Sequence, residues 1–319
     1  MKKTSWKARA KRWGAALLFP VLRVFVGLLA RTRTLDAFGA LMGWFGYHFS
    51  KKGKSLALAN LKVAFGDEKN EKEMDEIYRV SLVESAQNLL ELFSIAARAY
   101  GSKDLLSRVR FEGLEHLDAA LAQGKGVIAL GAHLGSFAMM LCALCARGYP
   151  MAVVYKEAKD MQEGFYKNMM SYYGVIPIAF SGEAGMTRAI LRALREGKVV
   201  LLQIDQGKKN GVWARFFKRL VKTAAGPAVI SQRTGAPVVP MFSFRDKKQH
   251  VVEISPPLNL KKSPDRQEDI LFNTQIMSDV LEKAIREHPE AWLWRYRRFR
   301  KSRLLPEVQE ASRQEAVEQ

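Results

Sequence analysis

The chain has 319 residues, enough for one large domain or two small ones, and 48% of them are hydrophobic, which supports a buried core. Its formal net charge is +19, so nucleic acid, anionic lipid and acidic protein all fit as partners. Cys142 and Cys145 form a Cys-x-x-Cys pair that lacks the second ligand pair of a metal site and the usual context of a redox motif. We therefore expect no metal, no disulfide and a reducing compartment.

The first fifty residues begin with a basic leader and continue with two apolar stretches. The stretch Ala15–Ala30 is interrupted by Pro20 and Arg23. As a helix it would span about 24 Å, which is less than the roughly 30 Å of a bilayer core. No convincing signal-peptide cleavage site follows it.

The second apolar stretch, Leu35–Phe49, is rich in aromatic residues. We expect residues 13–49 to form one or two helices that lie in the membrane interface, because aromatic rings and flanking cations favour that depth. An ordinary hydrophobic helical hairpin packed on the rest of the protein is the alternative. The basic flanks place the body of the protein on the cytoplasmic side.

Beyond residue 50, apolar segments of strand length alternate with segments of helical periodicity. Helices are predicted over 55–65, 71–100, 114–123, 137–146, 161–173, 184–196, 225–234 and 269–288, and strands near 109 and over 127–130, 151–155, 175–180, 199–205, 237–244 and 250–255. This order predicts an α/β domain over residues 51–305, with a mainly parallel central sheet flanked by helices. The polar tail, 306–319, is expected to be disordered.

His133 follows the predicted strand 127–130 and precedes the predicted helix 137–146. In open α/β sheets, ligands bind at this carboxyl edge. The helix start offers N–H groups and a positive dipole end, so N–H groups near Gly135 and Ser136 are expected to stabilise an oxyanion. The alternative is a histidine that only caps a loop.

Six blocks in this order resemble those of the bacterial lipid A late acyltransferases, the lauroyl and myristoyl transferases of the lysophospholipid acyltransferase superfamily. The resemblance covers most of the chain. The blocks are Asn60–Phe65, Val109–Leu117, Gly124–Phe137, Leu202–Gln206, Phe216–Pro240 and Pro289–Phe299.

The resemblance implies a glycerolipid-acyltransferase-like fold and transfer of a fatty acyl chain to a hydroxyl of a lipid A precursor or another lysolipid. The donor would be a thioester of acyl carrier protein or CoA, and the site would be the cytoplasmic face of the bacterial inner membrane. His133 would be the general base. No cofactor is implied, and no nucleic-acid module is visible in the sequence.

The chain departs from the family motif His-x-x-x-x-Asp/Glu, because Ala138 stands where the acid belongs. That acid normally orients the imidazole. Three alternatives follow: an engineered inactivating change, a natural enzyme with Asp205 or Glu157 as its acid, or a non-catalytic lipid-binding protein of the same fold.

The remaining candidate residues form two groups. Acceptor-binding roles are expected for side chains that follow strands at the sheet edge of His133 or that lie in the later blocks: Lys156, Gln206 and Thr223. Contacts with the donor or the membrane are expected for basic and aromatic residues of the last two blocks: Arg215, Phe216, Phe217, Arg297 and Arg298.

Overall fold

The structure, a computed structural model, describes residues 24–30, 34–156, 164–180, 182–247 and 249–305. Its centre is a seven-stranded sheet with the order β1-β9-β8-β2-β5-β3-β4. All neighbouring strands are parallel except β8 and β9, which are antiparallel. The strands are β1 (Val109–Glu112), β2 (Val127–Gly131), β3 (Met151–Tyr155), β4 (Ile176–Ala179), β5 (Val199–Gln203), β8 (Val238–Asp246) and β9 (Gln249–Ile254).

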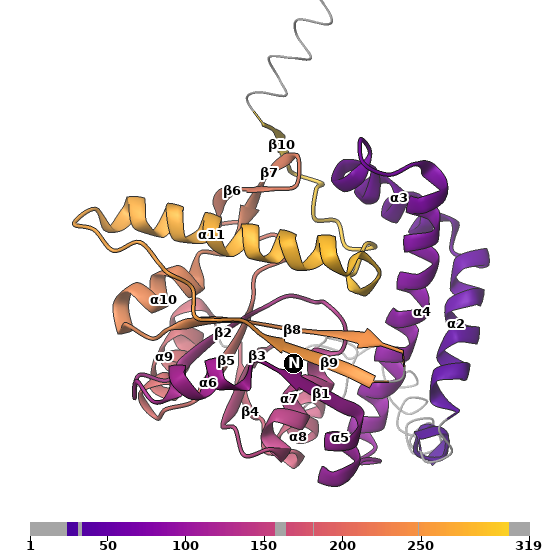
Figure 1. The fold of residues 1–319 in the computed structure, drawn as a ribbon, viewed down its shortest axis with the longest axis horizontal. Coiled ribbons are helices and arrows are strands. Elements are labelled where there is room, and N and C mark those ends of the chain that lie inside the picture. Colours follow the sequence, from indigo (N-terminus) through magenta and orange to yellow (C-terminus); the bar gives the residue numbers. More distant parts are fainter. Residues whose placement is uncertain (1–23, 31–33, 157–163, 181, 248, 306–319) are drawn as a thin grey trace, which may run out of the picture.

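Helices cover both faces of this sheet (Figure 1) and form two apolar cores. Side chains of β2 alternate between them, because successive residues of a strand point to opposite faces: Ile128 and Leu130 lie in one core, and Val127 and Ala129 in the other. The first core contains α3 (Lys51–Phe65), α9 (Glu183–Arg195), α10 (Gly226–Thr234) and α11 (Arg266–Glu287), and the second contains α5 (Ser102–Arg108), α6 (Leu114–Leu121), α7 (Phe137–Ala146) and α8 (Phe165–Tyr172).

The long helix α4 (Glu71–Ala96) contributes to both cores. It begins at a capping box, in which Asn70 and Glu73 each accept the backbone N–H of the other. Helix α2 (Leu35–Phe49) lies alongside α4 (Figure 1). Its Gly39 and Gly43 face Gln87 and Val83 of α4 so closely that an added Cβ would collide with their backbones.

A second, three-stranded sheet has the order β10-β7-β6. Its strands are β6 (Val212–Phe216), β7 (Arg219–Thr223) and β10 (Arg303–Leu304). It is joined to α11, where the Ser278 hydroxyl donates to the Arg215 carbonyl at 2.6 Å. A short 3₁₀ turn, η1 (Pro289–Ala291), follows α11.

The predicted α/β architecture is confirmed: a mainly parallel sheet flanked by helices. The sequence missed α5 and the second sheet, and it extended the fifth strand to Asp205, whereas β5 ends at Gln203. Among the described residues, no helix combines the length and hydropathy needed to cross a bilayer. Membrane association of the N-terminal segment stays a prediction, and residues 1–23 and 31–33 lie outside the described part of the chain.

Candidate active site

The register between β2 and β5 brings His133 and Asp205 together. These strands are parallel neighbours, and Gly131 at the end of β2 pairs with Gln203 at the end of β5. His133 and Asp205 each follow two residues later, so both side chains emerge at the same height of the same sheet edge. His133 Nδ1 lies 3.0 Å from Asp205 Oδ1, across 72 residues of sequence.

The contacts of His133 define its tautomer. An ionised carboxylate can only accept a hydrogen bond, so the hydrogen between Nδ1 and Asp205 belongs to the imidazole. Nε2 then carries a lone pair, and the amide nitrogen of Gln206, at 3.3 Å, donates to it. The His133 side chain is 30% exposed, so part of the imidazole is open to a molecule outside the protein.

Asp205 is buried, with only 2% of its surface exposed. Burial alone raises the pKa of Asp205, but hydrogen bonds from His133 and Trp292 outweigh it and hold this pKa below its usual range. The Trp292 indole N–H donates to Oδ2 at 3.1 Å. Asp205 is therefore ionised at neutral pH and orients the imidazole.

The loop after β2 is held against the segment that follows η1. Leu134 and Trp292 form an antiparallel bridge, and the N–H of Gly135 donates to the Ala291 carbonyl at 2.9 Å. Gly135 has a φ of +58°, and an added Cβ would lie 1.9 Å from the Ser243 carbonyl oxygen, so only glycine fits. Because its N–H is already bonded, Gly135 does not offer this group to an oxyanion, contrary to our expectation.

Ser136 is buried immediately before α7. The first N–H groups of an α-helix have no acceptor within the helix. The first N–H groups of α7 therefore remain the candidates for stabilising an oxyanion.

Ala138 is buried on α7 among apolar side chains. It cannot accept a hydrogen bond from His133, and Asp205 occupies that place instead. Of the two replacement acids considered from the sequence, the structure pairs Asp205 with His133, while Glu157 lies outside the described residues.

Lys156 and Gln206 also lie at the catalytic edge. Lys156 follows β3, which is separated from β2 by β5, and its Nζ lies 5.9 Å from the Phe180 ring centre. Lys208 approaches the same ring at 5.8 Å. Gln206 contacts His133 directly, whereas Lys156 lies one strand farther along the edge.

Four residues that we expected to contact substrate or membrane are instead buried structural residues. Phe216 and Phe217 pack on each other and on Phe299. The Arg298 guanidinium donates to the Thr223 hydroxyl at 2.8 Å, and both side chains are buried. The prediction that Phe216, Phe217 and Arg298 face the donor or the membrane does not fit their burial, because segments distant in the sequence cover them. Thr223, which we expected to bind the acceptor, is buried as well. Arg215 and Arg297 are exposed.

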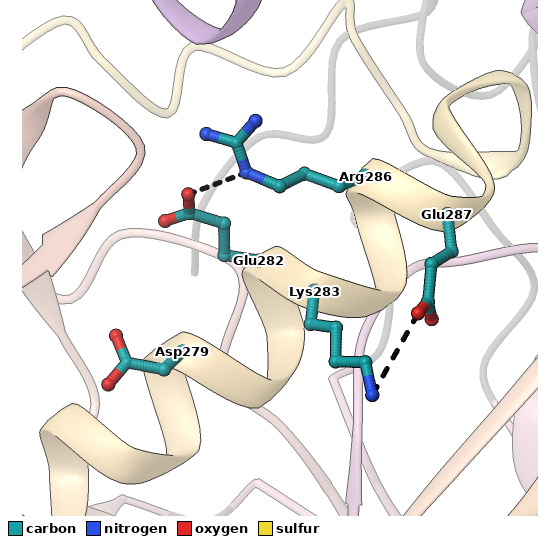
Figure 2. A pocket seen from close by; sticks show the side chains of 5 residues that line it. All are labelled: Asp279, Glu282, Lys283, Arg286 and Glu287. Carbon is teal, nitrogen blue, oxygen red and sulfur yellow. Dashed lines mark hydrogen bonds and ion pairs between the residues drawn. The ribbon is translucent and has the colours of Figure 1, made fainter.

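A surface hollow lies on α11 (Figure 2). All of its lining residues come from this helix, and they carry charges of both signs: Asp279, Glu282, Lys283, Arg286 and Glu287. The Arg286 side chain bonds Glu282 of the same helix at 2.8 Å and Glu68, which follows α3, at 2.8 Å, so the charge of Arg286 is already paired. Within the described residues, no three His, Cys, Asp or Glu side chains are arranged to hold a metal ion.

Sequence reasoning missed Trp292 as a partner of Asp205. The block Pro289–Phe299 resembles the family, but a single sequence does not show which of its indole N–H groups reaches Asp205. Only the packing of η1 and Trp292 against the β2 loop brings this indole to the buried carboxylate.

Comparison with known proteins shows which family the chain resembles. The chain is 25% identical over 301 residues to a lipid A biosynthesis acyltransferase of Haemophilus influenzae, covering 91% of this chain and 89% of that protein. It is 28% identical over 285 residues to a lipid A biosynthesis palmitoleoyltransferase of Escherichia coli, covering 82% and 83%. A phosphatidylinositol mannoside acyltransferase of Mycobacterium tuberculosis is 27% identical over 186 residues, covering 56% of each chain. The sequence model of the bacterial lipid A biosynthesis acyltransferases matches residues 1–301, and the chain therefore belongs to this family of acyltransferases.

Proposed function

We propose that this protein transfers a fatty acyl chain from a thioester to a hydroxyl of a membrane lipid, with His133 as general base and Asp205 as the acid that orients it. The observation that carries the proposal is the pair itself, at 3.0 Å on the carboxyl edge of a parallel sheet. The neighbouring chemistry suits acyl transfer, because α7 begins shortly after His133 and the N–H groups and positive dipole end at a helix start can stabilise an oxyanion.

The proposed step begins when the acceptor hydroxyl replaces the Gln206 amide at Nε2 of His133. The hydroxyl oxygen attacks the thioester carbon while its proton moves to Nε2. Asp205 stabilises the resulting imidazolium through the Nδ1–H bond. When the tetrahedral intermediate collapses, the carbon–sulfur bond breaks and the departing thiolate takes the proton from Nε2, so the histidine returns to its starting state.

The acceptor is proposed to be a lipid A precursor or another lysolipid, and the donor an acyl carrier protein, with CoA as the alternative. The names of the relatives support a saccharide-bearing lipid as acceptor. Exposed cations of the segment that contains Trp292, such as Arg297 and Arg300, suit an acidic donor or an anionic head group.

Attachment to the cytoplasmic face of the inner membrane is also proposed, through the outer face of α2. Trp44, Phe45 and Phe49 are exposed there by 50%, 48% and 75%, and Lys51 and Lys52 follow. An apolar aromatic face bordered by cations suits a bilayer interface.

The membrane proposal is tested by flotation with vesicles of phosphatidylethanolamine and phosphatidylglycerol. Replacing Trp44, Phe45 and Phe49 with serine should leave most of the protein at the bottom of the gradient. Replacing Leu271 and Phe272, equally exposed residues of α11, should change nothing. Substitution is a better test than deletion of residues 1–49, because deletion also removes the packing of α2 on α4. Equal flotation of all three proteins would reject α2 as the anchor.

The reaction is tested by mass spectrometry of total lipids from cells with and without the gene, and with His133→Ala or Asp205→Asn. The wild-type gene should add one acyl chain to one lipid class, and both variants should fail to do so. Retained acylation with His133→Ala would reject the proposed base. Lipid binding without acylation by the wild type would favour the second candidate, a non-catalytic lipid-binding protein, which Ala138 suggests.

A further inference from the structure

The segment after η1 contacts Asp205 and the residue next to His133. The backbone of Trp292 bridges Leu134, which is the neighbour of His133, and its indole N–H donates to Asp205 Oδ2. One residue thus connects the base-bearing loop to the acid that orients the base.

The indole is held firmly from several sides. Its ring is 1% exposed and makes edge contacts with Phe216 at 5.8 Å and with Trp294 at 4.7 Å between ring centres. The chain beyond it is fixed to α3, because the Asn60 amide donates to the carbonyls of Trp294 at 2.7 Å and Tyr296 at 2.8 Å.

The same segment is also fixed to the second sheet. Arg298 donates to the carbonyl of Lys222 at 3.0 Å and to the hydroxyl of Thr223 at 2.8 Å. Residues from α3, β7 and the segment after η1 therefore combine to set the position of a single N–H group.

A carboxylate rotates readily about its last side-chain bond, because that torsion is broad and twofold. Asp205 is restrained because each of its oxygens has its own donor: His133 on Oδ1 and Trp292 on Oδ2. We infer that Trp292 is a positioning residue, whose indole N–H holds Asp205 in the rotamer that accepts Nδ1–H of His133. The inference rests on the reaction proposed above, in which this tautomer leaves Nε2 free to act as base.

The chain offers a matched control. The indole N–H of Trp294 is also bonded, at 2.6 Å, but to the carbonyl of Pro289. Trp294 is as deeply buried as Trp292, at 1% exposure. Trp292→Phe and Trp294→Phe therefore remove similar volumes and one hydrogen bond each, and only Trp292→Phe removes a bond to Asp205.

The experiment reads the ring nitrogens of His133 by NMR in the full-length chain, labelled with ¹⁵N-histidine, at a pH where the imidazole is neutral. His133→Gln assigns the signal among the five histidines. The wild type and Trp294→Phe should show the Nδ1–H tautomer alone. Trp292→Phe should show a mixture of both tautomers, as should Asp205→Asn.

Kinetics supply the second measurement, with dodecanoyl-acyl carrier protein as donor and a lipid A precursor as acceptor. For Trp292→Phe, kcat should fall about 10- to 100-fold because the catalytic groups lose their alignment. KM should stay unchanged, because the indole is buried away from substrate. If Trp292→Phe does not fold, benzothienylalanine at position 292 replaces the N–H with sulfur and keeps the ring shape.

An unchanged tautomer and kcat in a folded Trp292 variant would overturn the inference, as would equal losses in the Trp294 control. The NMR measurement needs no substrate, so it separates this inference from the proposed function. If the wild type transfers no acyl chain but the tautomer still depends on Trp292, the proposed reaction is wrong and the positional role stands.

Discussion

Ala138 lies on α7 and cannot orient the imidazole of His133, and Asp205, which follows β5, is the proposed acid instead. Asp205 already accepts the hydrogen bond from Nδ1 of His133, so Nδ1 has no further hydrogen to donate to a second acid. Position 138 is moreover buried among apolar side chains, where a carboxylate is costly.

We therefore expect Ala138→Glu to give no gain in acyl transfer and a lower melting temperature. Asp205→Asn should reduce kcat by up to about 10⁴-fold, because the imidazole loses its orienting acid. Steady-state kinetics of the two variants and the wild type check this. A tenfold gain for Ala138→Glu would mean that the wild type lacks its acid and that Asp205 does not replace it.

Glu84 on α4 supplies a second prediction, about stability. Burial, with the nearby charge of Glu290, raises the pKa of Glu84 from 4.5 to about 7, and the opposing charges of Arg245 and His288 do not offset this. A carboxyl with a raised pKa binds more protons in the folded state, so its contribution to stability is lost as the pH rises from about 4.5 to 7.

Glu84→Gln should then be more stable than the wild type at pH 8, by about 1–3 kcal/mol, and this advantage should disappear near pH 5. The hydrogen bond to Glu290 raises the pKa of His288, and His288 is present in both proteins, so the difference in stability between the two proteins is the quantity to measure. Glu91→Gln is the contrast: it should be less stable at both pH values, because Glu91 pairs with Arg245 and His250. A constant difference for Glu84→Gln across this range would contradict the assignment.

At the scale of single residues, the sequence indicated His133 as the candidate base and Asp205 as one of two candidate acids, but it could not decide between the two acids. His133 was recognisable because an apolar run ends there in small residues, and Asp205 because it ends a later run. Their contact depends on β5 lying beside β2, and strand order is a property of the folded sheet that one sequence does not contain. Phe216 and Phe217 were misplaced for a similar reason, since the cover that buries them comes from the last block of the chain.

At the scale of secondary-structure elements, the pair α2–α4 depends on two glycines. A Cβ at Gly43 would lie 2.5 Å from Val83 Cα, whereas a Cβ at Gly46 would have no neighbour within 4 Å. The helices can approach this closely only because position 43 has no side chain.

We expect Gly43→Ala to destabilise the protein by about 1–3 kcal/mol, because the helices must separate. Gly46→Ala should instead stabilise it by about 0.5–1 kcal/mol, since alanine is the better helix former. Chemical unfolding of both variants measures this. If the two substitutions had the same sign, the close approach of α2 to α4 would be in error.

The regular elements were the part of the fold most accessible from sequence. Strands β2, β3 and β9 and helices α7, α9 and α10 lie within about two residues of their predicted bounds, because buried parallel strands are short apolar runs with clear ends. The second sheet was missed because its strands mix aromatic and charged residues. This pattern does not show which side of the sheet is buried, and in the structure α11 contacts β6.

At the scale of the whole molecule, the positive charge is unevenly distributed. Residues 206–224 hold six Lys or Arg and residues 291–305 hold another six, and neither segment contains Asp or Glu. The first segment begins beside Asp205 and the second contains Trp292, so both border the catalytic pair. The hollow on α11, by contrast, carries both signs of charge (Figure 2).

Charge reversal at Arg297 and Arg300 should therefore raise the apparent KM for an anionic donor and weaken its dependence on salt. Arg300 is chosen for this variant instead of Arg298, because the Arg298 side chain is buried. Reversal of Lys262 and Lys283, which are exposed near and on α11, removes the same net charge and should leave both properties unchanged. Equal effects of the two pairs would show that only the overall charge matters.

The distribution of the site along the chain has a consequence for its synthesis. His133, Asp205 and Trp292 leave the ribosome in that order, and each belongs to a different part of the fold. The base emerges first, but its partner acid reaches it only after β5 has paired with β2, and the indole arrives later still. A nascent chain that ends before residue 292 therefore carries His133 and Asp205 without the indole that donates to Asp205, so the proposed site is complete only after Trp292 has been added.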